Sequence, residues 1–128
     1  MLLNIQNRAL KMDGYILLSH GSKVQESNDA NKKILETLRS TIQNIELAFL
    51  ELSKPDFEHA VKNLKASDVT SITVLPLFLA PGKHVREDVP HLALKFSKEY
   101  EIEIKVLEHI GAKSEYIKLI ESILLSKK

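Results

Sequence analysis

Cysteine is absent from the 128 residues of this chain. Its absence excludes disulfides, thiolate metal sites, iron–sulfur clusters and cysteine nucleophiles. Any metal ligand must therefore come from histidine, aspartate or glutamate. Long apolar runs are also missing: none approaches the roughly 20 residues of a membrane span, and the N-terminus shows no signal-peptide core. We therefore expect a cytoplasmic protein with no membrane partner.

A strong net charge is lacking as well, because 18 Lys and Arg residues face 17 Asp and Glu residues. Without a global field of one sign, we expect no nucleic-acid partner. The composition, with 44% hydrophobic and 27% charged residues, is typical of a globular protein. The length suits one domain. We expect an N-terminal extension over residues 1–13, in which Met12 could be the biological start, and a single α/β domain over residues 14–128.

Four short apolar segments predict β-strands, at residues 14–18, 45–51, 70–78 and 102–107. Segments with apolar residues at helical spacing lie between and after them, and predict helices over 27–44, 53–67, 88–100 and from 114 onward. Ser53 and Asp88 are the expected caps of the second and third helices, and the last helix is expected to face the sheet. Strict alternation predicts a four-stranded parallel sheet with helices on both faces, a flavodoxin-like three-layer sandwich.

Ligands of such sheets bind at the carboxyl ends of the strands. His20, Glu51 and His84 lie at the carboxyl ends of the first three predicted strands, and the pair Glu108-His109 lies at the end of the fourth. Candidate functional residues therefore gather on one rim of the sheet. His59 and His91, by contrast, fall on the polar faces of their predicted helices, which is typical of solvated surface residues.

Two histidines and a carboxylate on one rim suit a divalent ion such as Co²⁺, Ni²⁺, Fe²⁺ or Zn²⁺. They equally suit proton transfer near neutral pH. No HExxH pair or other local ligand spacing separates these two uses. Lys54, Lys83 and Arg86 also lie near the rim, where they could hold a carboxylate-rich or phosphorylated ligand or serve as ordinary surface charges.

Other protein classes share the alternating pattern. Histidine phosphatases have an Arg-His-Gly motif after the first strand, but Ser19 stands before His20 here, so the arginine that clamps phosphate is missing. Receiver domains have acidic residues at this position, and flavodoxins have a hydroxyl-rich phosphate loop. Neither matches well. A non-catalytic metal or tetrapyrrole carrier would need the same rim and stays open.

Four motifs occur in register along the chain: LLSHGS, AFLELSKP, VLPLFLAPGKHVREDVP and EHIGA. Together, from Gly14 to Leu125, they resemble the short single-domain sirohydrochlorin chelatases of the CbiX type, which belong to the class II chelatase superfamily. The resemblance implies a chelatase-like α/β fold. It also implies insertion of a divalent metal into sirohydrochlorin, with Co²⁺ for cobalamin biosynthesis as first choice and Ni²⁺ or Fe²⁺ as alternatives. The short members act as homodimers.

The resemblance also implies roles for residues that match the motifs. His20 corresponds to a proton acceptor and metal ligand, and His84 to a second metal ligand. A substrate-binding loop corresponds to Leu79, Ala80, Pro81, Gly82, Lys83 and His84. Glu51 corresponds to a further, more variable substrate contact. No cofactor is implied beyond the divalent metal substrate. The alternative on the same fold is a carrier that binds metal or tetrapyrrole without turnover.

Overall fold

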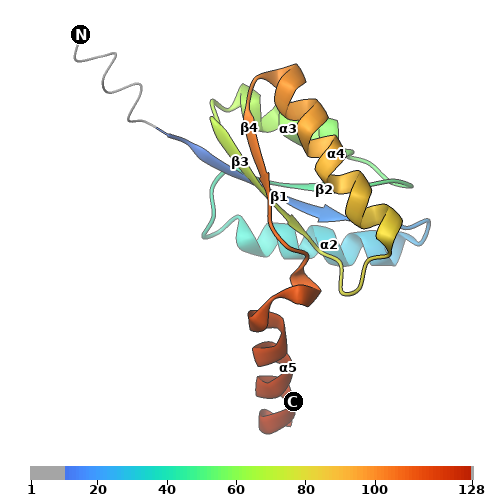
Figure 1. Ribbon diagram of the computed structural model, residues 1–128. Helices are drawn as coiled ribbons and strands as arrows, with labels where there is room; N and C mark the ends of the chain where they lie inside the picture. Colours follow the sequence, from blue (N-terminus) through green and yellow to red (C-terminus); the bar gives the residue numbers. More distant parts are fainter. Residues whose placement is uncertain (1–10, 128) are drawn as a thin grey trace.

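The computed structural model describes residues 11–127 and shows strands and helices in alternation (Figure 1). The elements are β1 (Asp13–Ser19), α2 (Gln25–Leu38), β2 (Ile45–Phe49), α3 (Phe57–Ala66), β3 (Ser71–Pro76), α4 (Lys83–Tyr100), β4 (Glu103–Val106), the short 3₁₀ helix η1 (Ile110–Ala112) and α5 (Ser114–Ser126). The expected N-terminal extension lies outside the described residues up to residue 10. Met12 already belongs to the sheet region, because its carbonyl accepts a 2.9 Å hydrogen bond from the Thr70 amide.

The four strands form one parallel sheet in the order β2-β1-β3-β4. This confirms the predicted sheet. The chain winds outward from β1 to β2 and then back across to β3 and β4, so the winding direction changes between β1 and β3. Ligands of doubly wound sheets bind at such a switch point. His20 follows β1 and His84 follows β3, so the two histidines flank it.

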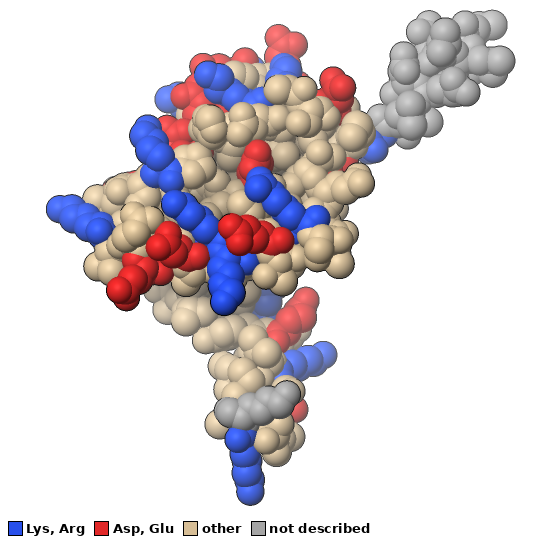
Figure 2. Space-filling model, turned by 180° about the vertical axis from the view of Figure 1, so that it is seen from behind, with Lys and Arg blue, Asp and Glu red and all other residues tan. Residues whose placement is uncertain are grey.

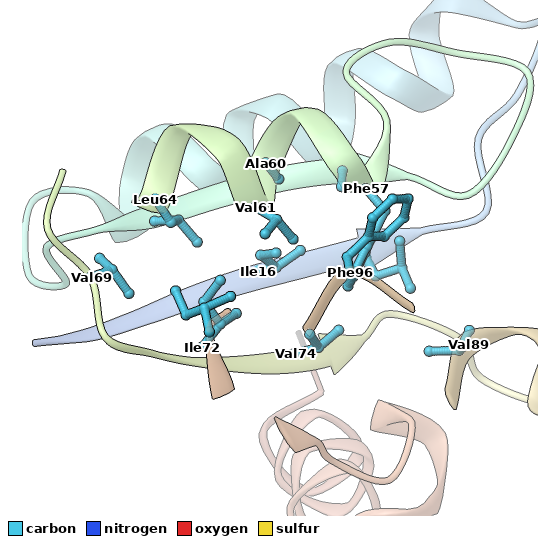
Figure 3. Packing of buried hydrophobic residues seen from close by; sticks show 13 residues of the cluster. Ile16, Phe57, Ala60, Val61, Leu64, Val69, Ile72, Val74, Val89 and Phe96 are labelled. Atoms are coloured by element: carbon cyan, nitrogen blue, oxygen red, sulfur yellow. The ribbon is translucent and has the colours of Figure 1, made fainter. Parts of the chain in front are cut away.

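Helices α3 and α4 cover one face of the sheet, and α2 covers part of the other (Figure 1). Under α3 and α4, the inward side chains of β1 and β3 alternate with outward ones, and Ile16, Leu18, Ile72 and Val74 are fully buried. Figure 3 shows Val61 of α3 packed over these strands. A smaller cluster fills the space under α2 and includes Leu17, Leu35, Leu47 and Phe49. These two clusters hold the ends of the central strands in place.

Three helices differ from the sequence analysis at their starts. α2 begins at Gln25 rather than residue 27, and it ends at Leu38 rather than residue 44. α3 starts at Phe57, with Asp56 rather than Ser53 as its cap, because the Asp56 carboxylate accepts a 2.9 Å hydrogen bond from the His59 amide. That bond is the main cause of a lowered Asp56 pKa. α4 starts at Lys83, five residues before the expected cap Asp88. Val85 packs against the core and so extends the buried stripe of α4 by a turn toward its N-terminus.

The last helix differs most from expectation. α5 projects away from the domain instead of facing the sheet (Figure 1). Ile117, Ile120, Ile123 and Leu124, which were expected to pack on the sheet, are all exposed. An apolar stripe predicts that a helix has a surface to cover, but it does not identify that surface.

Between residues 11 and 127, no helix combines the length and the apolar character that crossing a bilayer requires. On the face shown in Figure 2, lysine and arginine side chains are interspersed with acidic ones. This agrees with the near balance of charge in the sequence.

Candidate functional site

His20 is the first residue after β1, and its ring contacts acceptor oxygens on both sides. Nε2 lies 2.9 Å from Oε1 of Glu51, and both side chains are about half exposed. Nδ1 lies 3.3 Å from the carbonyl oxygen of Gly21. A neutral imidazole can donate a hydrogen bond from only one of its nitrogens. The tautomer of the ring therefore decides which of the two oxygens receives a hydrogen bond.

The backbone brings Glu51 to His20. Hydrogen bonds that continue the β1–β2 pairing run past the strand ends, from the Leu50 amide to Ser19 (2.8 Å) and from the Glu51 amide to His20 (3.0 Å). Gly21 then crosses directly over Glu51: its φ is +96°, and a β-carbon there would lie 1.8 Å from the Glu51 carbonyl oxygen. Only glycine combines this positive φ with so close a backbone approach.

A buried polar side chain ties the same two loops together. Asn28, in the first turn of α2, is buried. Its Oδ1 accepts from the Ser22 amide at 3.1 Å, and its Nδ2 donates to the Ser22 carbonyl (2.8 Å) and to Oγ of Ser53 (2.7 Å). Ser53 Oγ in turn donates to the Ser22 carbonyl at 2.9 Å. Asn28 therefore joins the loop after β1 to the loop after β2, a role that its sequence position did not reveal.

We expect Asn28→Ala to lower the free energy of unfolding by about 2–3 kcal/mol, because it removes three hydrogen bonds from a buried site. The matched control is Asn31→Ala, one turn further along α2. Asn31 donates a 3.0 Å bond to the Ser19 hydroxyl and a longer, 3.5 Å bond to the Ser27 carbonyl from a less buried position, so its loss should cost about 1 kcal/mol. Urea denaturation measures both. Equal effects of the two substitutions would contradict the role assigned to Asn28.

His84 is the second residue of α4, so it stands on a helix and not in the preceding loop. Its side chain is 89% exposed, and its Nε2 lies 3.1 Å from Oδ2 of Asp88 one turn later. Residues 84, 88, 91 and 95 fall on one stripe of α4. That stripe borders a hollow of about 330 Å³, which is lined by Leu50, Glu51, His84, Val85, Asp88, His91, Leu92 and Lys95.

Glu51 is the residue that links the two histidines, since it contacts His20 and lines the same hollow as His84. Sequence reasoning placed all three on one rim but missed Asp88 and His91 as neighbours of the site. His91 is exposed, as expected, yet it also lines the hollow. The spacing of i, i+4 and i+7 from His84 would have shown this, had α4 been predicted to begin at residue 83.

The loop that precedes α4 is apolar and open. Leu79 is 59% exposed, and the loop rests on Gly111 from η1. The Gly111 amide donates a 3.0 Å hydrogen bond to the Phe78 carbonyl. A β-carbon on Gly111 would lie 1.8 Å from the Leu79 carbonyl oxygen. The glycine of the EHIGA motif therefore supports the loop from behind.

The remaining rim candidates lie elsewhere. His109 and Glu108 border a second hollow of about 380 Å³ beside Arg86. Lys54 pairs with Asp56 at 3.6 Å near the start of α3, and Lys83 is exposed at the start of α4. Across residues 11–127, no three histidine or acidic side chains are grouped closely enough to hold a metal ion. The described side chains thus form two His–carboxylate pairs, and not one closed metal centre.

Comparisons with known proteins agree on one family. The CbiX family model matches residues 14–126. A sirohydrochlorin cobaltochelatase from Saccharolobus solfataricus is 41% identical over 81 residues, a segment that spans 63% of each chain. The chain thus matches just under two thirds of that relative's length.

Solved structures give the same result. A putative cobalamin biosynthesis CbiX protein from Marinobacter aquaeolei superposes with a TM-score of 0.83 at 31% identity, over 91% of this chain and 95% of that one. The sirohydrochlorin chelatase SirB from Bacillus subtilis, in a complex with cobalt, has a TM-score of 0.76 at 24% identity, over 90% of this chain and 50% of that one. This second likeness concerns the fold. With a family model that covers nearly the whole described chain, the protein belongs to the CbiX family.

Proposed function

We propose that this protein is a sirohydrochlorin chelatase that inserts Co²⁺ into the metal-free tetrapyrrole, with Ni²⁺ and Fe²⁺ as further metal substrates. The observation that carries the proposal is the placement of His20, paired with Glu51, and of His84 at the switch point of the sheet, where Glu51 and His84 border one hollow. The relative from Saccharolobus solfataricus bears the name sirohydrochlorin cobaltochelatase, which supports cobalt as the first choice.

The spacing of the donor atoms suits a metal that is bound and then released. Two donors at about 2.1 Å from one ion are separated by about 3.0–3.4 Å when they subtend 90–109°. The His20–Glu51 and His84–Asp88 pairs are 2.9 and 3.1 Å apart. A divalent ion can therefore replace the hydrogen bond of either pair with little side-chain movement. The exposed, two-ligand pairs should hold the ion loosely enough to surrender it to the macrocycle.

The same pairs can take up the protons that metal insertion releases. Each pyrrole N–H that the metal displaces must pass its proton to a base. When the metal leaves Nε2 of His20, that nitrogen is free to accept a proton, and the resulting imidazolium is held by Glu51 on one side and the Gly21 carbonyl on the other. His20 thus exchanges a metal for a proton at one atom.

The loop from Leu79 to Gly82, together with Lys83 and His84 in the first turn of α4, is proposed to hold the tetrapyrrole. Its exposed apolar side chains offer a floor for a flat ring. At its end the first amides of α4 lack a side-chain cap, since Gly82 is the N-cap residue. Free amides at a helix N-terminus attract carboxylates, and sirohydrochlorin is rich in them. Lys95 lines the same hollow as His84, and Lys83 precedes His84 in the sequence. Both lysines add positive charge.

A homodimer is part of the proposal. The hollow beside His84 is open, whereas a flat macrocycle must be covered on both sides to be oriented and desolvated. A second copy related by a two-fold axis is the usual way to supply the missing wall. We expect the specific activity to fall on dilution as the dimer dissociates. Constant specific activity down to concentrations at which the chain is monomeric would contradict this part of the proposal.

A multiple-turnover assay tests the proposed activity. Protein at catalytic concentration, mixed with sirohydrochlorin and excess Co²⁺ near pH 7, should convert the visible spectrum of the pigment to that of the metallated form over many turnovers. The rate should fall in acid, because imidazolium neither binds metal nor accepts a proton. A carrier would stop at one pigment per site. If Co²⁺, Ni²⁺ and Fe²⁺ all entered the ring no faster than in buffer, the chelatase proposal would fail.

A further inference from the structure

A second hollow lies beside the first turns of α4, on a different flank of the helix from His84. Its volume is about 380 Å³, which is within the range of small-molecule pockets. Arg86, which borders it, follows His84 by two residues and therefore points to the opposite side of the helix. The walls are apolar and come from the end of β3 and the loop after it, from α4, and from the end of β4. They consist of Pro76, Phe78, Pro81, Val85, Val89, Pro90, Val106 and Leu107.

The charged or titratable side chains that border this hollow are Arg86, Glu108 and His109. Arg86 and Glu108 are exposed, and His109 is half-buried. Arg86 takes part in none of the ion pairs among residues 11–127. Arg39, by contrast, has its guanidinium 2.7 Å from the carboxylate of Glu46. The guanidinium of Arg86 is therefore placed to bind a ligand, and not to hold the fold.

This combination of groups favours one kind of ligand chemistry. Apolar walls pack against methylene groups, and a guanidinium binds a carboxylate through two parallel hydrogen bonds. The imidazole of His109 can add a further donor. A metal ion would be repelled by Arg86, and a bare phosphate would leave the apolar walls unused. The hollow therefore suits a short hydrocarbon chain that ends in a carboxylate.

The hollow adjoins the surface that is proposed to hold the tetrapyrrole. Pro81 belongs to that loop and also lines the hollow, and Val85 borders both this hollow and the one beside His84. The end of β4 runs beside the loop (Figure 1), where the Gly111 amide is bonded to the Phe78 carbonyl. Only the first turns of α4, about 10–12 Å across with their side chains, separate the two hollows. The peripheral chains of one tetrapyrrole can bridge that width.

We propose that this hollow anchors one acetate or propionate chain of the tetrapyrrole, with Arg86 as the clamp of its carboxylate and His109 as a second donor. The inference rests on the tetrapyrrole substrate of the proposed function and adds to it a residue that determines specificity. Anchoring one edge of the macrocycle orients the ring relative to His84 on the other flank of α4. It also selects a macrocycle with acidic chains over one with uncharged chains.

Glu108 limits the strength of this anchor. It borders the same hollow and forms no ion pair with Arg86 among the described side chains. Its negative charge therefore repels the carboxylate of the ligand without neutralising the guanidinium by direct contact. An anchor weakened in this way can release the product after each turnover. Glu108→Gln should accordingly tighten the binding of the pigment.

A titration of the protein with metal-free sirohydrochlorin, followed by the absorbance of the pigment, tests the anchor. Arg86→Gln should raise the dissociation constant about tenfold, because a charged hydrogen-bond donor is lost. Arg86→Lys should lie between this variant and the unmodified chain, since lysine keeps the charge but lacks the fork. The matched control is Lys98→Gln, which removes the same charge from an exposed position of α4 outside both hollows. It should bind the pigment like the unmodified chain.

Steady-state insertion of Co²⁺ separates anchoring from chemistry. The anchored chain is remote from the pyrrole nitrogens, so Arg86 should bind the substrate and the transition state equally well. Arg86→Gln should then raise KM for sirohydrochlorin about tenfold and leave kcat and the KM for Co²⁺ nearly unchanged. A loss in kcat with an unchanged KM for sirohydrochlorin would contradict an anchoring role.

Two further results would overturn the anchor. The first is equal affinity of Arg86→Gln and the unmodified chain for sirohydrochlorin, which would leave the chelatase proposal intact if the unmodified chain still metallates the pigment. The second is an equal loss of affinity in Lys98→Gln, because overall charge would then explain the effect. An unmodified chain that does not bind sirohydrochlorin would reject both proposals. Binding that depends on Arg86, without turnover, would support the anchor and reject the chelatase activity.

Discussion

Replacing His20 or His84 with alanine is expected to lower chelation by at least a hundredfold. Each imidazole is proposed both to hold the incoming ion and to receive a proton, and a positioned acid–base group alone contributes about 10²–10⁴ in rate. Loss of one histidine should not be compensated by the other, since they belong to separate pairs, with Glu51 and with Asp88. Steady-state metallation of sirohydrochlorin with Co²⁺ measures the effect.

The thermal midpoint separates a loss of chemistry from a loss of structure. Both side chains are exposed at the rim, so neither substitution should change the midpoint by more than a degree or two. His59→Ala is the matched control. His59 is also exposed and contacts a neighbouring side chain, Asn63, at 3.2 Å, but it lies on α3 outside the hollow that His84 borders. It should keep full activity. Near-normal turnover in either rim variant would disprove the role of that histidine.

Substituting Gly21 with alanine is expected to have the second largest effect, on stability and activity together. The new methyl group would meet the Glu51 carbonyl oxygen at 1.8 Å, and the backbone would have to keep a φ of +96°. Such a conformation costs a non-glycine residue about 1–3 kcal/mol before any clash is counted. The loops must separate to make room, which would draw Glu51 away from His20. Denaturation should show a loss of about 2–4 kcal/mol, and chelation should fall with it.

Gly82→Ala provides the control for stability. Gly82 has an ordinary φ of −69°, and nothing lies within 4 Å of a β-carbon placed there. The Gly82→Ala variant should have the same free energy of unfolding as the unmodified chain. If Gly21→Ala were equally harmless, the close crossing of the two loops would not be what holds the site together.

The sequence alone determined the fold and the rim. Uninterrupted apolar runs such as residues 14–18 are typical of strands buried on both faces, and such strands occur in parallel sheets. Because these strands alternate with helical segments, each strand–helix–strand connection is expected to cross the sheet in the right-handed sense. Because every strand of a parallel sheet ends at the same edge, the positions of His20, Glu51 and His84 along the chain were enough to predict a shared site.

Only the tertiary structure decided how these residues are paired and supported. The contact of Glu51 with His20 depends on Gly21 crossing over a loop some 30 residues away in sequence, and Asn28 acts across a similar separation. The start of α4 depends on the packing of the partly buried Val85 against the core, which no local cap signals. For α5, the apolar stripe was visible in the sequence. That the helix projects from the domain instead of packing on its own sheet was decided by the tertiary structure, because η1 is bonded to the domain and Lys113 after it is extended.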